Sequence, residues 1–238
     1  MKRFIFPLMV LYAACFSCTN SNNAPAPQQE KQETKTEKRN IIKKPLSIPS
    51  EFSYITNVGS VNVIFTPGDY NITVEGDSAL LPYVSTNFDS NILTVSLQGD
   101  ANKDINLYGA NNLVTMHISA PSLECASVCG TGNFVFDGKW ESESIQIGSL
   151  DNGSITLGEV ECKHFKFEAT SKANVSIKHL KADDAMFNFR FATTFTADVD
   201  IERLTVYNDG SPKLTLTGNA TNLYISKPKD ANLSCSIK

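Results

Sequence analysis

Apolar and polar residues alternate along most of the chain after residue 50, and from residue 123 onward the alternation repeats about every 20 residues. Alternate side chains of a β-strand point to opposite faces, so one set of columns fills an interior and the other faces solvent. Stacked repeats bury an interior that a single repeat cannot cover. The aligned apolar columns of the six repeats are Leu123, Ile145, Phe165, Ala185, Leu204 and Leu223; Cys125, Ile147, Phe167, Phe187, Val206 and Ile225; Phe134, Ile155, Val175, Phe195, Leu214 and Leu233; and Phe136, Leu157, Ile177, Ala197, Leu216 and Cys235.

This periodicity predicts an all-β fold, and specifically a parallel β-helix, or β-solenoid, with rungs of about 20 residues. Each rung contributes two short strands joined by turns. An antiparallel β-sandwich has strands of similar length with the same alternation, so it remains the alternative architecture.

The chain upstream of the repeats is expected to form hairpin-like strands that precede the solenoid. Residues 61–76 contain two alternating runs on either side of Pro-Gly-Asp at 67–69, and these three residue types favour a tight turn. Residues 91–98 and 113–120 alternate in the same way. Between the hairpin and these strands, residues 78–84 are expected to form a short helical turn.

One outward column of the predicted solenoid consists mostly of small hydroxyl side chains. A ladder of hydroxyl groups on a flat face can hydrogen-bond a glycan or another protein, so this column is a possible binding face. The alternative is that β-branched threonine simply suits an exposed strand. The candidate residues are Thr156, Ser176, Thr196, Thr215 and Ser234.

The first 18 residues have the pattern of a bacterial lipoprotein signal peptide. Lys2 and Arg3 precede an apolar stretch at 4–16, which is shorter than the roughly 20 residues that span a bilayer. A lipoprotein signal places the lipid-bearing cysteine directly after the cleavage site, and both Cys15 and Cys18 follow a small residue. We favour Cys18, because hydrophilic sequence follows it at once; an ordinary cleaved signal is the alternative. The pattern predicts an outer-membrane lipoprotein of the cell envelope, on the periplasmic side or at the cell surface.

The chain after the signal divides into a tether and one domain. Residues 19–50 contain a long run rich in Asn, Gln, Pro, Lys and Glu without large apolar side chains, which cannot bury enough surface to offset the entropy of ordering. We expect a disordered tether here. Residues 51–238 are long enough for one substantial domain, the adhesin-like solenoid.

The charge of the domain argues against nucleic acid as a partner. Residues 51–238 carry 13 Lys and Arg against 22 Asp and Glu, so their net charge is −9, whereas residues 1–50 carry 8 against 3. An acidic domain exerts no long-range attraction on phosphate backbones. The membrane, reached through the lipid, and a glycan or protein ligand are the expected partners.

The cysteines and histidines of the domain have no metal-ligand spacing, so we expect no metal and no cofactor. The column alignment assigns Cys125 and Cys235 to the interior, where a thiol behaves as a small hydrophobic group, and we expect the domain's thiols to be unpaired. The full set is Cys125, Cys129, Cys162, Cys235, His117, His164 and His179.

An alternative function is a β-helical carbohydrate-active enzyme, which needs carboxylates clustered across rungs. Asp183 and Asp184 are adjacent, and Asp198 and Asp200 share a strand face, yet the neighbours of Asp198 in its aligned column are Lys and Thr. We therefore predict no catalytic residues.

The segments 59–63, 80–84, 120–123 and 130–133 resemble a known family: a glycine followed by an Asn-containing strand, the turn Leu-Leu-Pro-Tyr-Val, the step Ala-Pro-Ser-Leu and the turn Gly-Thr-Gly-Asn. This is the adhesin-head family, or head GIN domain, of Bacteroidetes secreted proteins and lipoproteins. The resemblance covers about residues 50–226. It implies a β-helical fold and an adhesin-like role, and it supplies no catalytic residues.

The function predicted from the sequence is a lipid-anchored, non-catalytic binding or scaffolding protein of the cell envelope. The carbohydrate-active enzyme is one alternative. A purely structural, self-associating module is the other, because exposed solenoid ends carry unpaired strand edges that favour a homo-oligomer.

Overall fold

The computed structural model of the protein describes residues 40–97, 114–226 and 232–238. The expected signal peptide at 1–18, with Cys15 and Cys18, and the expected tether up to residue 39 lie outside these residues. Within the described part of the chain, no helix is long and apolar enough to cross a membrane.

The described residues form strands almost throughout, as alternation predicts, together with the short helical turn η1 (Leu81–Tyr83) within the segment expected to contain one. The strands are β1 (Ile41–Pro45), β2 (Tyr54–Gly59), β3 (Asn62–Pro67), β4 (Asn71–Asp77), β5 (Val84–Asp89), β6 (Ile92–Leu97), β7 (Val114–Ala120), β8 (Cys125–Gly130), β9 (Asn133–Ser149), β10 (Ser154–Ala169), β11 (Asn174–Phe189), β12 (Thr194–Asn208), β13 (Lys213–Ile225) and β14 (Asn232–Ile237).

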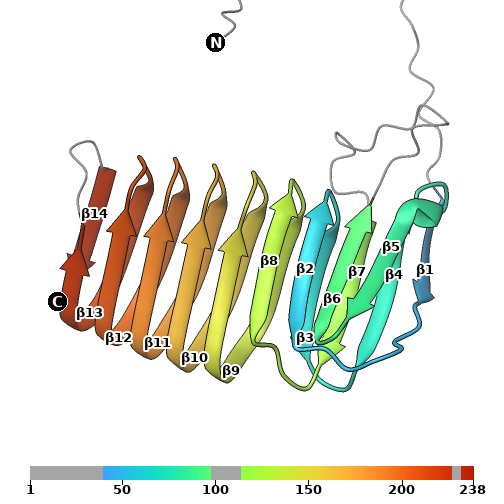
Figure 1. Cartoon of the computed structure of the whole chain (residues 1–238), viewed down its shortest axis with the longest axis horizontal. Helices are drawn as coiled ribbons and strands as arrows, with labels where there is room; N and C mark the ends of the chain where they lie inside the picture. The colour runs from blue at the N-terminus through green and yellow to red at the C-terminus, as the bar shows by residue number, and fades with distance from the viewer. Residues whose placement is uncertain (1–39, 98–113, 227–231) are drawn as a thin grey trace, which may run out of the picture. The chain divides into compact units, whose positions relative to one another are not determined.

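Strands β9 to β14 stack in parallel and confirm the predicted β-solenoid (Figure 1). Ile155 of β10 pairs with Phe134 on one side and with Val175 on the other, so successive rungs are about 20 residues apart. This parallel register excludes the antiparallel sandwich.

The interior columns are filled as predicted from Ile145 to Leu216, and their side chains are at most 4% exposed. Phe167, Phe187, Phe189 and Phe195 pack together with ring centroids 5.0–5.5 Å apart. Burial of such rings is the main favourable contribution to a core of this kind.

The prediction that Cys125 lies in an interior column is wrong. Cys125 pairs with the outward Gln146, and the buried Ala126 pairs with Ile147. The first repeat is therefore shifted by one residue, because Pro121 and Ser122 form part of a connection and not of a strand. Cys235 does occupy its predicted column, but it is exposed in the last described rung. The four described cysteines are all free, as expected.

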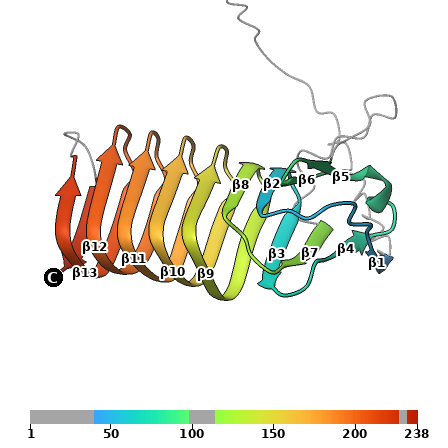
Figure 2. The same ribbon diagram turned by 60° about the horizontal axis from the view of Figure 1, so that its bottom comes forward.

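The predicted hairpin at residues 61–76 does not form, although both of its strands do. β7 lies between β3 and β4, parallel to β3 and antiparallel to β4 (Figure 2). The Pro-Gly-Asp turn reverses the chain but leaves room for one more strand, which residues 114–120 occupy. A true hairpin occurs instead at β5 and β6, where Ser90 takes the left-handed conformation at the turn.

The rung formed by β2 and β3 is inserted out of sequence order. It lies between the rung of β6 and β7 and the rung of β8 and β9, and it pairs in parallel with both. The turns stack closely here: a Cβ at Gly130 would lie 2.3 Å from the carbonyl oxygen of Gly59. Gly130 also has a φ of 155°, so both the space and the backbone favour glycine.

The prediction of a disordered tether is wrong for residues 41–45. Ile41–Pro45 form the edge strand β1, which pairs with β4 in antiparallel register. All five residues are exposed, so their composition gives no burial signal. Backbone pairing with β4 holds them in the sheet, and Lys43 also lies 3.8 Å from the Glu75 carboxylate.

Candidate functional site

The predicted hydroxyl column lies on one side of the solenoid as a continuous row. The register pairs Thr156 with Ser176, Ser176 with Thr196, Thr196 with Thr215 and Thr215 with Ser234. Thr215 is half-buried and the others are exposed. The row lies outside the groove and the smaller pocket described below, and its role as a binding face stays a prediction.

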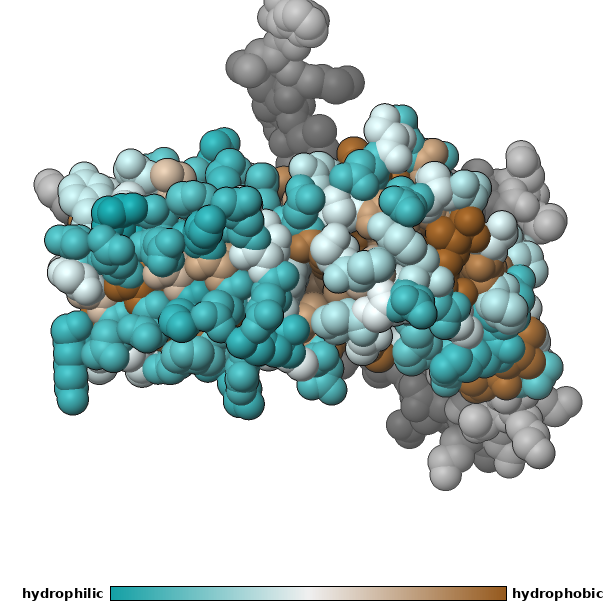
Figure 3. Space-filling view, turned by 90° about the horizontal axis from the view of Figure 1, so that it is seen from below, coloured by the Kyte–Doolittle hydropathy of each residue, from teal (hydrophilic) through white to brown (hydrophobic). Residues whose placement is uncertain are grey.

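A long groove runs across the rungs on a different side of the solenoid, where each of β9 to β13 passes from one long face to the next (Figure 3). Its volume is about 880 Å³. Seen from this side, two rows of hydrophilic side chains border a paler, more apolar strip. The groove is thus a concave surface that spans several rungs.

Small and apolar side chains form the floor of the groove. Successive rungs place Ser142, Cys162, Ala182 and Ile201 next to one another. Three of the four are at most 8% exposed. Because most of these side chains are short, the larger charged residues on either side stand above the floor and create the depression.

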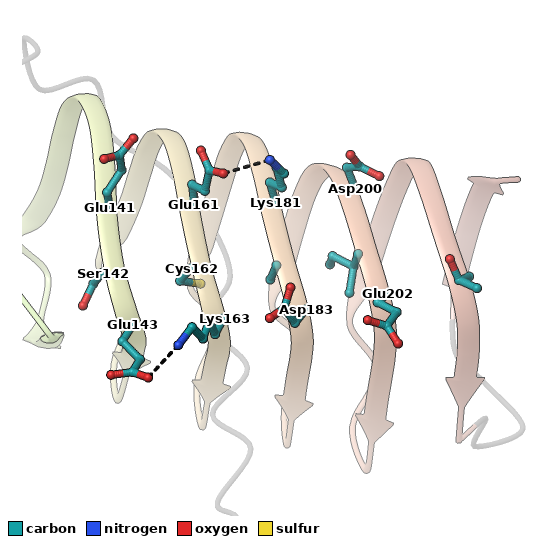
Figure 4. A pocket seen from close by; sticks show the side chains of 13 residues that line it. Glu141, Ser142, Glu143, Glu161, Cys162, Lys163, Lys181, Asp183, Asp200 and Glu202 are labelled. Carbon is teal, nitrogen blue, oxygen red and sulfur yellow. Dashed lines mark hydrogen bonds and ion pairs between the residues drawn. The ribbon is translucent and has the colours of Figure 1, made fainter.

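Charged side chains form two rails along the floor, and Figure 4 shows both. Six carboxylates and two lysines line the groove, so its net formal charge is −4. The first rail comprises Glu141, Glu161, Lys181 and Asp200, and the second comprises Glu143, Lys163, Asp183 and Glu202.

The carboxylates at the β9–β10 end of the groove are paired with lysines. The Glu161 carboxylate lies 2.8 Å from Lys139 Nζ and 2.8 Å from Lys181 Nζ. Hydrogen bonds from Lys139 and then Lys181 lower the pKa of Glu161 to about 2. Glu143 accepts a hydrogen bond from Lys163 at 2.9 Å, which lowers its pKa as well.

The carboxylates at the β11–β12 end are less compensated. Asp183 and Asp200 have no ion-pair partner within 4.0 Å among the described residues. Glu202 pairs with Arg203, 3.3 Å away. Asp183 and Asp200 are therefore open to a cationic ligand.

The groove contains a cysteine that is unsuited to nucleophilic chemistry. Burial raises the pKa of the Cys162 thiol to about 12. A thiol with this pKa stays protonated at neutral pH, and the thiolate is the reactive form. Cys162 therefore serves as a small floor residue.

Carboxylates from several rungs line the groove, although the sequence showed no such cluster around Asp198. In the structure, Asp198 lies outside the groove and accepts hydrogen bonds from His179 at 2.7 Å and from Thr217 at 2.9 Å. Asp183 lines the groove, whereas the adjacent Asp184 lines a separate pocket, so these two neighbours do not act together. The groove itself was missed, because its residues lie beyond a corner of each rung.

Trp140 is not the exposed turn residue that a sugar-binding role requires. Its side chain is 2% exposed, stacks on Phe136 with centroids 5.0 Å apart and donates a hydrogen bond to the Leu123 carbonyl at 2.8 Å. Within the described residues, no group of three or more His, Cys, Asp or Glu has an arrangement that could hold a metal ion.

Several solved structures have the same fold. A putative adhesin from Bacteroides fragilis is 15% identical over 84% of this chain and 94% of its own, with a TM-score of 0.61. Putative adhesins from Parabacteroides distasonis (19% identity, 76% and 81% coverage) and Parabacteroides merdae (16% identity, 83% and 96% coverage) both have a TM-score of 0.58. At these identities the likeness concerns the fold alone. Among curated proteins, none matches the sequence.

A family model gives the remaining evidence. The model described as "Putative auto-transporter adhesin, head GIN domain" matches residues 51–179, more than half of the sequence. The match includes all of the segments on which the resemblance was based and ends within β11. The chain therefore belongs to the head GIN domain family of putative adhesins.

Proposed function

We propose that this protein is a lipid-anchored, non-catalytic adhesin-like module of the cell envelope, and that it binds an extended basic segment of a partner protein along the acidic groove. Membership in a family of putative adhesins supports the adhesin-like role and the extracellular or envelope location. The single observation that carries the choice of ligand is the groove, with its apolar floor and its excess of carboxylates.

The two rails and the floor match the two parts of a basic side chain. Lysine and arginine pack their aliphatic stems along apolar surface while their charged ends stay in water. The floor of Cys162, Ala182 and Ile201 can accept such stems, and the unpaired Asp183 and Asp200 can accept the charged ends. Complementary charges of this kind mainly give specificity and fast association.

The test measures binding of an unstructured lysine–serine repeat peptide to the purified protein by fluorescence anisotropy. We expect binding that weakens as salt is raised, because exposed charges are screened beyond about 10 Å at 0.1 M salt. The triple variant Asp183→Asn, Asp200→Asn, Glu202→Gln should raise the Kd at least about five-fold, which corresponds to roughly 1 kcal/mol.

A matched variant separates the groove from net charge. Asp89→Asn, Asp209→Asn, Glu51→Gln removes the same charge from exposed positions outside the groove. It should leave the Kd unchanged. Equal weakening in both variants, or a glutamate–serine peptide that binds as well as the lysine peptide, would overturn the proposal.

The lipid anchor is supported by the signal-like sequence of residues 1–18 and is tested separately. Cells expressing the full chain are fed an alkyne-tagged fatty acid, and the protein is examined for the label. Cys18→Ala should abolish labelling and Cys15→Ala should retain it. Labelling lost only in Cys15→Ala would move the anchor to that residue, and an unlabelled native chain would remove the anchor from the proposal.

A further inference from the structure

A second, smaller pocket lies on the neighbouring side of β10 to β12, and it is distinct from the groove. Its volume is about 320 Å³, within the range of small-ligand sites. Phe165 and Ala185 form part of its floor, and Met186 and Thr205 line it. Ala185 occupies a column that holds Ile, Phe and Leu in other rungs, so the floor is recessed at this point.

Each charged side chain that lines the pocket already has a partner of opposite charge. Arg203 donates two hydrogen bonds to the Asp184 carboxylate, which also lies 3.5 Å from His164 Nδ1. Lys166 lies 4.0 Å from Glu168. A bidentate pair between guanidinium and carboxylate holds its donors and acceptors in a fixed geometry. The pocket thus offers oriented hydrogen-bonding groups without a large excess of either charge.

Two exposed tyrosines lie next to the pocket. Tyr224 is 58% exposed and is the register partner of Thr205 on the adjacent rung, and Tyr207 is 40% exposed and lies two residues from Thr205 on the same strand. Their ring centroids are 6.3 Å apart in a T-shaped arrangement. Met186, which is 40% exposed, lies on the opposite side of Thr205 in the same column. Exposed apolar surface of this kind marks an interaction site when polar groups adjoin it.

We propose that this pocket and the two tyrosines bind uncharged sugar residues of a glycan. The C–H groups of a sugar ring are slightly positive and pack on the negative face of an aromatic ring. Sugar hydroxyls both donate and accept hydrogen bonds. They therefore suit the ion pair of Arg203 and Asp184 better than a charged group of a ligand would. This site does not depend on the acidic groove, and the two surfaces would bind different ligands.

Saturation-transfer NMR tests the proposal with the purified protein and a panel of uncharged oligosaccharides of glucose, mannose and N-acetylglucosamine. At least one of them should receive saturation at its ring C–H protons. Tyr224→Ala should abolish the transfer, whereas Tyr224→Phe should retain it, because the ring face and not the hydroxyl makes the contact. Thr205→Arg should also abolish it, because it places a long side chain over the pocket from an outward position.

Two controls keep the outcome specific. Tyr54→Ala removes another exposed tyrosine, on β2, and should leave the transfer unchanged. Asp200→Asn, a groove substitution at a side chain that has no ion pair with a residue lining the pocket, should also leave it unchanged, so a failure of the groove proposal is distinguishable from a failure of this one. The proposal is overturned if no panel member binds, if binding survives both Tyr224→Ala and Thr205→Arg, or if galacturonate oligosaccharides bind more tightly than all uncharged ones.

Discussion

At the scale of single residues, two glycines show how closely the turns of this solenoid are stacked. Gly130 and Gly138 both have a φ in the left-handed region, 155° and 121°. A Cβ on Gly130 would meet the backbone of Gly59 at 2.3 Å, whereas a Cβ on Gly138 would meet nothing within 4 Å. An alanine at position 138 therefore tests the cost of the backbone conformation alone. An alanine at position 130 tests that cost together with steric overlap.

Gly138→Ala should lower the free energy of unfolding by about 1–3 kcal/mol, the usual cost of an unfavourable φ for alanine. Gly130→Ala should lower it by clearly more, because the backbone of the neighbouring turn cannot move aside. Urea unfolding followed by circular dichroism measures both. Equal losses would show that the stacked turns yield to a methyl group.

The sequence predicted the interior residues well and individual special residues less well. The apolar columns from Ile145 to Leu216 are buried because a period-2 pattern within a 20-residue repeat leaves one consistent assignment. Cys125 was misjudged, since it follows the irregular connection at Pro121 and Ser122, where the spacing changes. In the structure it pairs with the outward Gln146.

At the scale of strands, the charged rails of the groove could not be predicted from the repeat spacing of the sequence. The distance in sequence from the last interior column to the first rail is five residues in β9, four in β10 and three in β12, because the strands shift register at the corner. The buried residues before and after the corner stay aligned from rung to rung. The outward residues at the corner cannot be aligned by counting residues in the sequence, because their number differs between rungs. The charged ladder could therefore be recognised only once the register was known.

The ion-paired part of this ladder makes stability depend on pH. The pKa of Glu161 in the folded protein is about 2, below its ordinary value of 4.5. Its pairing with lysines thus stabilises the fold above about pH 4.5, and this contribution is lost as the pH falls toward 2. Glu143, Asp184 and Asp198 have lowered pKa values and act in the same direction.

We expect the free energy of unfolding to fall between pH 5 and pH 2, and to fall less steeply in Glu161→Gln. Urea titrations at several pH values in this range measure the slope. Glu51→Gln, at an exposed position outside the ladder, serves as the control and should keep the native slope. An identical slope in all three proteins would show that solvent screens these exposed pairs completely.

At the scale of the whole molecule, the order of the rungs differs from the order of the chain. Repeat periodicity predicted the solenoid from residue 123 onward, but it could not place β2 and β3. These strands lie outside the repeat, and on one side they pair with strands 71 residues further along the chain. Alternation predicts which face of a strand is buried, but it does not predict with which strands it pairs. A hairpin between segments adjacent in the sequence was therefore expected.

The interleaved rung makes a prediction for hydrogen exchange. Residues 54–67 should exchange their amide protons with the same protection as residues 125–136, because each rung covers the other. Residues 71–77 should instead show the same protection of their amide protons as β1 and β7, with which they pair. Exchange followed by mass spectrometry resolves these peptides. If residues 61–76 exchange together as one unit, the insertion of β7 between β3 and β4 is wrong.

The insertion of the β2–β3 rung also limits the order in which the chain can fold during synthesis. The rung of residues 54–67 gains its partners β6 and β7 only when residue 120 has been synthesised, and its partners on the other side, in β8 and β9, only at residue 136. This part of the molecule therefore cannot fold one rung after another from the amino terminus. During this interval the nascent chain exposes one side of this rung, which β8 and β9 later cover.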